Sequence, residues 1–569
     1  MTLTESRPSD QLSGGCHVTI LADRCAGCQE CLVRCPTGAI GFDPERWVVE
    51  ADDTACVGCH QCERTCPFSA IQVHGAPMAA ERHAVRLSHP EDLIGDTSEI
   101  RRGFSSLEEA MAEASRCLSC PDPTCVRGCP AHNNIPAFVA AIAAGDLHGA
   151  RQVLRATTVM PDVCSRVCDQ STQCEGACSW SLAGAMPVAI GALERFVADS
   201  VGAPALEVSS SQGAGLSVGI VGSGPASIGA AFELLAAQAE VTVYEADDRP
   251  GGLLRWGIPD FTLPAAVAER PWGTLLEAGA QLRCGVRIGA GQLDDLASRH
   301  DAVILAHGAG VALSLPVPGA DLPGVQDATS FLNRAKDALD AGVVPDELTG
   351  RHGQVSTVLV LGAGNTAMDV ARSAVRLGAR AVCVDWMDRR FAPVRPDELA
   401  EAESEGVEVR FSTTLTRLEA GHGGRVGRAV LARTNQKAAG VRPQIVKGAD
   451  SAEEVDLVVA AMGYRIDPEF VEALPGTPVS KVVDSVPDRR WQASGILSDQ
   501  RSTFTHGRPV GRMALAREVT LAACAHPYRE RTWVAGDALA GPSTVVEAMA
   551  QGRRAAHAIL DSRPLRPDR

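Results

Sequence analysis

Cysteine is the residue whose spacing in this chain predicts chemistry most directly. Four cysteines and a proline form the pattern C-x2-C-x2-C-x3-C-P, and the whole pattern recurs 31 residues later. The first copy holds Cys25, Cys28, Cys31 and Cys35, and the second holds Cys56, Cys59, Cys62 and Cys66. In such a run three neighbouring thiolates bind one [4Fe-4S] cluster, and the fourth cysteine reaches the other cluster. We therefore expect one cluster on Cys25, Cys28, Cys31 and Cys66, and a second on Cys56, Cys59, Cys62 and Cys35.

Zinc is the alternative metal for these thiolates, but zinc sites use two separated C-x2-C pairs rather than four cysteines in one run. Residues 16–75 resemble the bacterial two-cluster ferredoxins, and this resemblance implies a ferredoxin-like βαββαβ domain. Cys16 lies outside the repeat and is interpreted as an ordinary thiol. Residues 76–110 show no strong periodicity, so we expect a linker with a short helix.

A second group of eight cysteines follows with a different spacing. Its members are Cys117, Cys120, Cys125, Cys129, Cys164, Cys168, Cys174 and Cys178. The stretch 106–117 reads as an amphipathic helix, and 135–157 also has helical periodicity. We expect residues 111–210 to form a helical domain whose loops carry cysteines, not another ferredoxin repeat.

The motifs of this region, E-A-S-R-C-L-x-C, C-x3-C-P, V-C-x-R-V-C and C-E-x-A-C, resemble the N-terminal domain of the glutamate synthase small subunit, which dihydropyrimidine dehydrogenase shares. The resemblance implies two more [4Fe-4S] clusters. It implies Cys117, Cys120, Cys125 and Cys178 as ligands of one cluster, and Cys129, Cys168 and Cys174 as three ligands of the other. The fourth ligand in the dehydrogenase is a glutamine in a G-x-L-Q motif, and Glu194 stands at that place here. Cys164 is the rival fourth ligand, and Asp169 replaces the proline that follows Cys168 in the family.

Two glycine-rich turns, each between an apolar strand and a helix, predict two dinucleotide-binding folds. In the first, Gly222 makes the tight turn, Gly224 lets a pyrophosphate approach the backbone, and Ser227 takes the third glycine position. The corresponding residues of the second fold are Gly362, Gly364 and Ala367, together with Asn365. An acidic residue ends the next strand 23 residues after each first glycine, and these residues are Glu245 and Asp385. A carboxylate at this position suits the hydroxyl pair of a ribose.

The C-terminal segment 531–556 indicates which fold binds FAD. It reads as a strand, then Gly536 and Asp537, then a helix that starts near Thr544. The segment resembles the part of two-dinucleotide flavoproteins in which the aspartate binds the ribityl chain, so FAD is expected on the first fold. A helix N-terminus also favours the negative charge of a reduced flavin.

Two further segments of the flavin half resemble the glutamate synthase family. The segment 250–264, which includes Gly252, resembles the stretch that covers the flavin. His307 replaces the threonine of an A-T-G motif, and we interpret it as a structural residue rather than an acid–base group. The whole family resemblance covers about residues 105–569.

The end of the second strand in the second fold predicts the nicotinamide nucleotide. Relatives that use NADPH carry Y-R-R-x-R there, and their arginines bind the 2′-phosphate. This chain reads Asp385-Trp386-Met387-Asp388-Arg389, so the first two arginines are absent. We expect NADH to be preferred over NADPH, because an acid accepts a ribose diol and repels a phosphate. Arg389 and Arg390 leave weaker NADPH binding open, and the alternative role of Asp385 is to cap the turn.

These motifs predict an α/β and α+β multidomain protein, a two-dinucleotide flavoprotein with iron–sulfur domains. The FAD-binding domain is expected in two parts, residues 211–345 and 480–569, and the NAD(P)-binding domain, residues 346–479, lies between them in sequence. The stretches 435–452 and 484–505 are expected to be loops.

Composition excludes several classes of function. The chain has 569 residues and a formal net charge of −16, which argues against nucleic acid or an anionic membrane as partner. It has no run of about 18 apolar residues that could span a bilayer, and its first residues lack the apolar core of a signal peptide. We expect a cytoplasmic protein whose cysteines bind metal rather than form disulfides. Cys284, Cys383 and Cys524 lie far apart in the flavin half, so a disulfide reductase is not expected.

The combined motifs predict an NAD(P)H-dependent oxidoreductase. Electrons would pass between NADH, FAD, four [4Fe-4S] clusters and an external partner, either ferredoxin or a 2-oxoacid:ferredoxin oxidoreductase-type enzyme. No catalytic side chain is assigned, because the cofactors carry the reaction. One alternative is a glutamate synthase small subunit that supplies a separate large subunit. The other is an electron-relay or assembly subunit whose nicotinamide site is degenerate.

Overall fold

The computed structural model describes residues 15–83, 85–88, 92–202, 205–343, 357–392, 394–473 and 531–562, with a few further positions between 504 and 528. The chain divides into two compact units. The first comprises Met1–Arg86, Gly103–Gly202 and Val486–Glu518, and the second comprises Leu87–Arg102, Ala203–Ser485 and Val519–Arg569. Residues 76–110, expected to be a linker, are thus shared between the two units.

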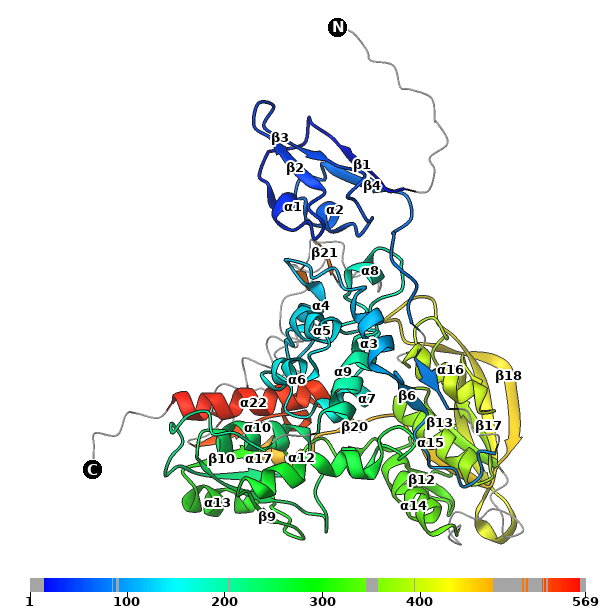
Figure 1. Cartoon of the computed structure of the whole chain (residues 1–569). Coiled ribbons are helices and arrows are strands. Elements are labelled where there is room, and N and C mark those ends of the chain that lie inside the picture. The colour runs from blue at the N-terminus through cyan, green and yellow to red at the C-terminus, as the bar shows by residue number, and fades with distance from the viewer. Residues whose placement is uncertain are drawn as a thin grey trace. The chain divides into compact units, whose positions relative to one another are not determined.

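The first unit begins with a ferredoxin-like fold of order βαββαβ, drawn in dark blue in Figure 1. Strand β1 (His17–Ile20) pairs antiparallel with β4 (Ile71–His74), and β2 (Ile40–Asp43) pairs antiparallel with β3 (Val48–Ala51). Helices α1 (Glu30–Val33) and α2 (Gln61–Thr65) follow Gln29 and His60, whose backbones are both left-handed. Since these two residues are 31 apart, the sequence repeat is also a repeat of backbone conformation.

Short helices form the rest of the first unit. They are α3 (Leu107–Ala114), α4 (Thr124–Gly128), α5 (Ile135–Ala143), α6 (Leu147–Arg155), α7 (Pro161–Val167), α8 (Ser179–Leu182) and α9 (Ile190–Ser200). The segment 135–157 forms two helices, α5 and α6. Gly145 ends the first with a left-handed φ of 77°, and Asp146 caps the second by accepting a hydrogen bond from the Gly149 N–H at 2.8 Å.

The second unit contains two five-stranded parallel sheets. The first has the order β23-β10-β7-β8-β9 and the second the order β12-β19-β13-β14-β15. The first is formed by β7 (Ser217–Val221), β8 (Glu240–Tyr244), β9 (Gln281–Arg283), β10 (Ala302–Leu305) and β23 (Thr532–Val534). The second is formed by β12 (Val325–Asp327), β13 (Thr357–Leu361), β14 (Arg380–Val384), β15 (Glu408–Arg410) and β19 (Leu457–Ala460).

The second sheet begins earlier in the chain than residue 346. Strand β12 pairs with β19, and the helix that follows, α14 (Ala328–Ala341), packs its buried face into the core of this sheet. Helices α15 (Asn365–Arg376) and α16 (Pro396–Ser404) contribute to the same core. The boundary expected at residue 346 is therefore too late, because 344–356 separates two elements of one sheet rather than two domains.

Helix α10 (Pro225–Ala236) and helix α22 (Val545–Asp561), the latter red in Figure 1, pack closely in the second unit. Glycines permit this approach. A Cβ on Gly552 would lie 1.8 Å from the carbonyl oxygen of Ala226, and one on Gly229 would lie 2.4 Å from that of Met549. The C-terminal helix is thus held against the glycine-rich turn that precedes α10.

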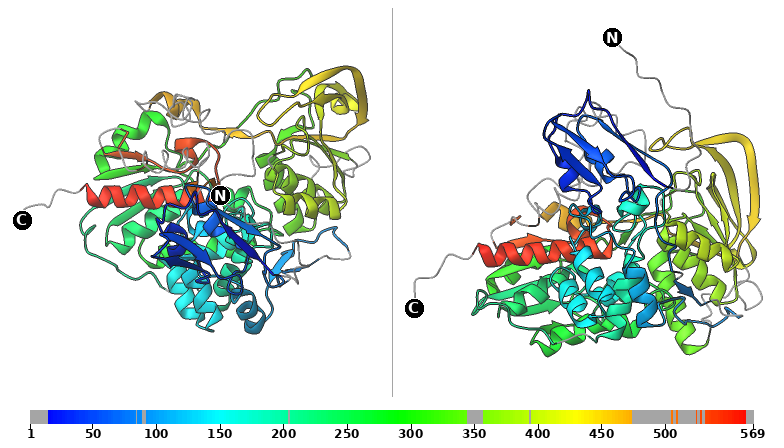
Figure 2. Two further views of the ribbon diagram at one scale, coloured as in Figure 1. Left: turned by 90° about the horizontal axis from the view of Figure 1, so that it is seen from above. Right: turned by 45° about the horizontal axis from the view of Figure 1, so that its top comes forward.

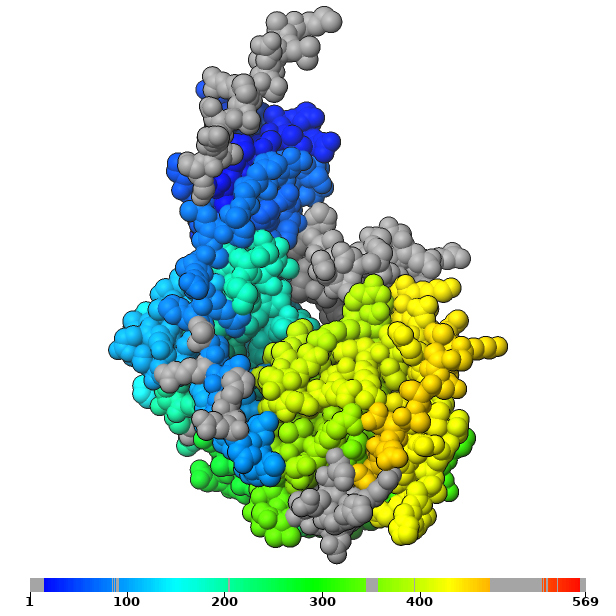
Figure 3. Space-filling view, turned by 90° about the vertical axis from the view of Figure 1, so that its right-hand side faces the viewer, coloured from blue at the N-terminus to red at the C-terminus, as the bar shows by residue number. Residues whose placement is uncertain are grey.

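A three-stranded antiparallel sheet adjoins the second five-stranded sheet. Its strands are β16 (Thr413–Ala420), β17 (Val426–Asn435) and β18 (Gln444–Glu454). The expectation of a loop over 435–452 was wrong for 444–452, which belong to β18, whereas 436–443 form neither helix nor strand. Strand β18 is exposed on both faces and so lacks the alternation of apolar and polar residues that reveals a strand; it is the long yellow strand in Figure 2, and it lies at the surface in Figure 3. Most of the other expected loop, 484–505, lies outside the described residues.

The remaining elements are short. They are β5 (Arg86–Leu87), β6 (Arg101–Gly103), α11 (Leu253–Trp256), α12 (Ala265–Glu277), α13 (Leu293–Arg299), β11 (Val311–Ala312), β20 (Tyr464–Arg465), α17 (Pro468–Ala473), β21 (Phe504–Thr505), β22 (Arg508–Pro509) and α21 (Asp537–Ala540). Among the described residues, no helix combines the length and apolarity needed to cross a bilayer.

Candidate functional site

Seven of the eight ferredoxin-type cysteines lie near one another in two groups, and the eighth, Cys25, packs against the core of the same fold. Burial, followed by the neighbouring Cys66 and Cys28, raises the pKa of Cys31 to about 11. Burial likewise raises the pKa of Cys62 to about 12, with Cys59, Cys35 and Cys56 as its thiol neighbours. Each set thus takes its fourth member from the other copy of the repeat, and Cys28 is the exposed member.

The backbone around these thiols suits anionic sulfur. Gly27 and Gly58 occupy equivalent places in the repeat, and both have left-handed φ values, 63° and 69°. A Cβ on Gly58 would lie 2.5 Å from Cys16 Sγ. The N–H of Ala70 donates to Cys66 Sγ at 3.3 Å. Burial raises the pKa values of Cys56 and Cys59, and backbone hydrogen bonds oppose this rise. Such donors stabilise thiolate and tune a bound cluster.

A third set lies in the helical part of the first unit. Burial, followed by Cys178, Cys117 and Cys120, raises the pKa of Cys125 well above its usual value. These four cysteines are the set that the family resemblance implies. The Ser179 hydroxyl lies 3.4 Å from Cys120 Sγ and adds a polar partner to it.

The fourth set contains Cys129, Cys168, Cys174 and Glu194. Burial and its neighbours Cys129, Cys168 and Glu194 place the pKa of Cys174 well above its usual value. Burial raises the pKa of Glu194 to about 8, against the opposing effect of Arg151. Its Oε1 atom is buried and accepts no hydrogen bond from the residues that the structure describes. An acceptor oxygen left without a partner beside three thiols fits an iron ligand.

Cys164, the rival of Glu194, belongs to the same neighbourhood. Its side chain is fully buried on α7. A hydrogen bond with Cys168 acts to lower its pKa, but burial and the nearby Glu194 and Cys129 raise it overall. In the part of the chain that the structure describes, no three of these side chains converge on a single-ion site. A cubane cluster is wider than one ion, and its ligands lie correspondingly further apart.

The first glycine-rich turn follows β7 and has the geometry expected for a pyrophosphate. Gly222 has a φ of 95°, and a Cβ there would lie 2.5 Å from the Ala306 carbonyl oxygen. Gly224 precedes the first residue of α10, and a Cβ on it would meet nothing within 4 Å. Gly252 packs against Gly224, so the segment 250–264 reaches this turn. The open space at a helix N-terminus therefore fits an anionic cofactor.

Polar side chains around this turn hold one another. Glu245 is buried, accepts a short hydrogen bond from the Ser223 hydroxyl, and accepts another from the Asp247 N–H at 2.8 Å. Ser223 also accepts from the Gly251 N–H at 2.9 Å. Ser227 is buried at the third glycine position. The sequence did not single out Ser223, although its place between Gly222 and Gly224 was a usable signal.

The C-terminal elements also lie as the FAD hypothesis requires. Gly536 has a φ of 71° and lies against Ala226 of α10. The Asp537 carboxylate accepts hydrogen bonds from the N–H and hydroxyl of Ser543, while burial raises its pKa. Thr544 caps α22 through a capping box with Glu547, which confirms the predicted start of this helix. The turn at Gly536 and the N-terminus of α22 are thus both part of the first five-stranded sheet and the helices that cover it.

The second glycine-rich turn repeats this arrangement after β13. Gly362 has a φ of 113°, and a Cβ on it would lie 2.5 Å from the Ala461 carbonyl oxygen. Gly364 precedes α15 with open space around it, Asn365 begins that helix, and Ala367 is fully buried. This turn fits a second dinucleotide.

Asp385 lies at the end of β14 and is buried. Its two carboxylate oxygens accept hydrogen bonds from the N–H groups of Ala363, at 2.9 Å, and Met387, at 2.7 Å. Burial raises its pKa. The residue therefore does the capping that was the alternative to ribose binding, although a carboxylate can accept further hydrogen bonds.

The arginines expected to favour NADPH are engaged with acids. Arg389 forms an ion pair with Glu403, with a nitrogen–oxygen distance of 2.7 Å, and Arg390 pairs with Asp388 at 2.8 Å. Trp386 is 40% exposed, and the Arg442 guanidinium lies 5.4 Å from its ring centre. This edge of the sheet thus presents an indole, and the two arginines that follow it are paired with acids.

His307 follows β10 and is half-buried, with both ring nitrogens shielded from solvent. Its ring stacks on Phe470 with centres 4.0 Å apart, and neither ring nitrogen has a hydrogen-bond partner among the described residues. Burial lowers its pKa to about 4. The imidazole is neutral near pH 7, as a structural residue would be.

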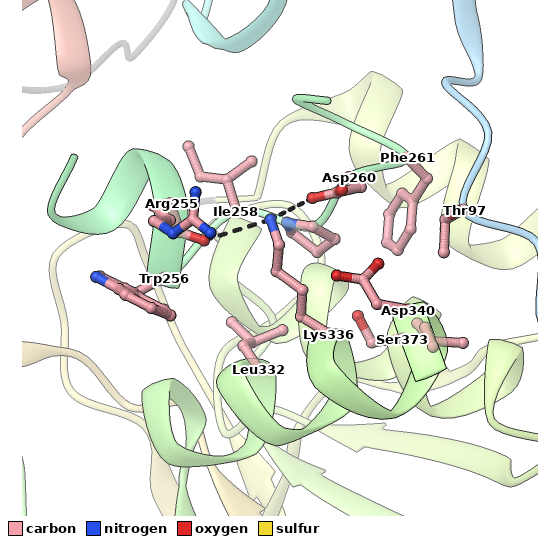
Figure 4. Close-up of a pocket in the computed structure, with 12 residues that line it drawn as sticks. Thr97, Arg255, Trp256, Ile258, Asp260, Phe261, Leu332, Lys336, Asp340 and Ser373 are labelled. Carbon is pink, nitrogen blue, oxygen red and sulfur yellow. Dashed lines mark hydrogen bonds and ion pairs between the residues drawn. The ribbon is translucent and has the colours of Figure 1, made fainter. Parts of the chain in front are cut away.

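A pocket of about 360 Å³ lies between the segment 255–261 and helix α14 (Figure 4). Lys336 points into it and pairs with Asp260, and its Nζ also donates to the carbonyl oxygen of Arg255 at 3.5 Å. Arg255 is paired with Glu269. Since both cations already have partners, the pocket offers neither of them freely to an anionic ligand.

Three family models match the chain. The 4Fe-4S dicluster domain matches residues 24–70, dihydropyrimidine dehydrogenase domain II with its 4Fe-4S cluster matches 94–204, and the pyridine nucleotide-disulphide oxidoreductase matches 216–479. The glutamate synthase [NADPH] small chain of Azospirillum brasilense is 33% identical over 484 residues, which cover 82% of this chain and 91% of that protein. The chain belongs to the glutamate synthase small-chain family.

Two further relatives show how far the likeness extends. The glutamate synthase [NADPH] small chain of Escherichia coli K12 is 31% identical over 476 residues, covering 81% of this chain and 93% of that protein. The putative oxidoreductase UacF of the same organism is 29% identical over 553 residues, covering 94% of this chain and 80% of that protein. This member of the small-chain family is a flavin and iron–sulfur oxidoreductase with NAD(P)-binding and 4Fe-4S domains.

Proposed function

We propose that the protein passes electrons between NADH, FAD, four [4Fe-4S] clusters and an external redox partner, namely ferredoxin or a 2-oxoacid:ferredoxin oxidoreductase-type enzyme of the cytoplasm. The observation that carries the proposal is the gathering of four ligand sets in one unit of a chain that also has two dinucleotide sheets. A flavin accepts one hydride, which carries two electrons, and can release these electrons one at a time. Iron–sulfur clusters carry single electrons. The protein's own part is to bind and orient these groups.

The residues that would hold each group follow from the described contacts. The glycine-rich turn at Gly222 and Gly224, with Glu245, Asp537 and the N-terminus of α22, would bind FAD. The turn at Gly362 and Gly364 would bind the nicotinamide nucleotide. The four sets would bind clusters, with Glu194 as the single carboxylate ligand. The two helix N-termini would stabilise the pyrophosphate groups, because the backbone N–H groups there have no partner within the helix.

NADH preference is part of the proposal. In support of it, Trp386 and Met387 stand where arginines would be needed, and Arg389 and Arg390 are paired with Glu403 and Asp388. Against it, the related small chains of Azospirillum brasilense and Escherichia coli are named as glutamate synthase [NADPH] small chains. In this chain an ion pair must break before either arginine can bind a 2′-phosphate.

A second candidate function is that of a glutamate synthase small subunit. It is favoured by the identity to the related small chains over 91% and 93% of their lengths. In this case the partner would be a large subunit that forms glutamate, rather than a ferredoxin-linked enzyme. The relay or assembly alternative requires a degenerate nicotinamide site, and the open turn at Gly364 disfavours it.

A steady-state assay separates these functions. The reconstituted protein, NADH and an oxidised two-cluster ferredoxin are mixed without oxygen, and ferredoxin reduction is followed; the reverse reaction starts from reduced ferredoxin and NAD⁺. Turnover in either direction supports the proposal. Glutamate formation from glutamine and 2-oxoglutarate only with a co-expressed large subunit, and no turnover with ferredoxin, would replace it with the second candidate.

A further inference from the structure

Asp122 contacts both iron–sulfur regions of the first unit. Its carboxylate forms ion pairs with Arg34 of the ferredoxin-like fold and with Arg127 of α4. Its carbonyl oxygen accepts a hydrogen bond of 2.8 Å from Nε2 of Gln61, whose side chain is buried. Arg34 also forms an ion pair with Glu30, with 3.1 Å between Nε of the arginine and Oε2 of the glutamate. Several polar contacts therefore join the two regions at one place.

The residues of this contact alternate in sequence with cysteines of the ligand sets. Arg34 directly precedes Cys35, and Gln61 lies between Cys59 and Cys62. Asp122 lies between Cys120 and Cys125. Helices α1 and α2 lie on the side of the ferredoxin-like fold that faces α4 and α8 (Figure 1). The contact therefore brings together one ligand set from each region.

The thiols of the two sets are close enough to interact. Burial raises the pKa of Cys120 to about 12, and Cys59 of the other region contributes to this shift. Arg64, on α2, interacts electrostatically with both Cys59 and Cys120, and these thiols oppose the lowering of its pKa by burial. A guanidinium thus lies near both sets, where it offsets the repulsion between two groups of thiolates.

We propose that this contact is a fixed electron-transfer junction between the set Cys35, Cys56, Cys59 and Cys62 and the set Cys117, Cys120, Cys125 and Cys178, with Arg64 as the cation that both share. The inference rests on the proposed function, since it takes both sets to bind [4Fe-4S] clusters. A single electron would pass between the clusters that the two sets bind. One cluster would be oxidised as the other is reduced, with no bond or proton changed. The set with the exposed Cys28 is then the end that an external protein meets.

Redox titration of Arg64 variants tests the junction. Full-length reconstituted protein is titrated with dithionite and mediators, and each cluster is followed by electron paramagnetic resonance. Reduction adds negative charge, so Arg64→Gln should shift two clusters to lower potential, whereas Arg64→Lys should keep both near the wild-type values. Arg46→Gln, which removes an exposed arginine of the same fold, should shift neither. A shift of one cluster or of none in Arg64→Gln would overturn the proposal.

A second variant tests the contact without relying on the potentials. Asp122→Asn removes the charge that two arginines share, so amide hydrogen exchange at residues 30–35 should become faster than in the wild type. Unchanged exchange would show that the contact is not what fixes the two sets, and would also overturn the proposal. Because dithionite replaces the nucleotide, failure of NADH to reduce the flavin would refute the proposed function alone.

Discussion

Glu194 lies near Cys129 in the helical region, and its carboxylate helps to raise the pKa of the Cys129 thiol. Burial, followed by Cys168 and Glu194, contributes to a pKa of about 12 for the Cys129 thiol. The Oε1 atom of Glu194 is buried and has no hydrogen-bond partner among the described residues. Leaving a carboxylate oxygen in such a place costs free energy unless something binds it. A [4Fe-4S] cluster held by this carboxylate and the three thiols, each on a different iron atom, would supply that partner.

Glu194→Ala should therefore remove one cluster of four. The expected result is a loss of about a quarter of the bound iron and sulfide, with the other clusters retained. Glu194→Gln, which places the dehydrogenase's own ligand type at this position, should keep the iron. The measurement is iron and acid-labile sulfide per chain after anaerobic reconstitution.

Cys164→Ser is the matched control for Glu194. If Glu194 is the ligand, this variant keeps its iron. The serine hydroxyl then only takes the place of the Cys164 thiol in the hydrogen bond to Cys168. Loss of iron in Cys164→Ser together with full iron in Glu194→Ala would assign the fourth position to Cys164 instead.

Two glycine variants test which sheet binds which cofactor. A Cβ on Gly224 or Gly364 meets nothing within 4 Å, so each variant to alanine should fold normally. Gly224→Ala should lose FAD, because its methyl group occupies the place of the pyrophosphate, while Gly364→Ala should keep FAD and raise KM for the nucleotide. Flavin absorbance per chain and nucleotide kinetics measure these outcomes. Loss of FAD in Gly364→Ala would reverse the assignment.

The preference for NADH should depend on the residues after Asp385. Replacing Trp386 and Met387 by arginines should raise kcat/KM for NADPH relative to NADH by about tenfold or more, since a hydrogen bond to a charged group contributes about 1.5–3 kcal/mol. Asp385→Asn should lower kcat/KM for NADH by less than about tenfold, because the amide oxygen can still accept a hydrogen bond in the turn. Kinetics with both nucleotides provide the measurement. An unchanged ratio in the arginine variant would contradict the role of this edge.

A buried ion pair should make the nucleotide-binding region sensitive to acid. Burial alone would raise the pKa of Glu405, but hydrogen bonds from Arg376 and Arg372, both almost fully buried, lower it overall. A lowered folded-state pKa contributes stability above the unfolded value of about 4.3, and the contribution is lost as the pH falls further. Glu405→Gln should thus cost about 3 kcal/mol or more at pH 7.

Calorimetry of wild type and variant at several pH values checks this prediction. The gap between their unfolding temperatures should stay constant down to about pH 5 and narrow below about pH 4.3. Glu403→Gln is the control, because it removes only the exposed partner of Arg389 and should cost less than about 1 kcal/mol. A gap that widens in acid would contradict the assigned charge state of Glu405.

Sequence spacing predicts four ligand sets because each motif is local, and the binding of iron by these residues stays a prediction. The fourth member of each ferredoxin-type set comes from the other copy of the repeat, with Cys66 lying 35 residues after Cys31 and Cys35 lying 21 residues before Cys56, yet the repeat itself indicates which cysteine crosses over. Spacing did not predict β18, whose exposed residues carry no apolar alternation, or the membership of β12 in the second sheet, which depends on pairing with β19 over a hundred residues later. Arg64 and Asp122 escaped notice because their partners lie in another region of the chain.

Anaerobic stopped-flow reduction tests the central claim most directly. The reconstituted protein is mixed with NADH or NADPH, and flavin and cluster absorbance are recorded together. We predict fast flavin bleaching by NADH, slower bleaching by NADPH, and loss of cluster absorbance after the flavin. If neither nucleotide bleaches the flavin of a fully reconstituted protein, the protein is not a nicotinamide-dependent oxidoreductase, and the account is contradicted.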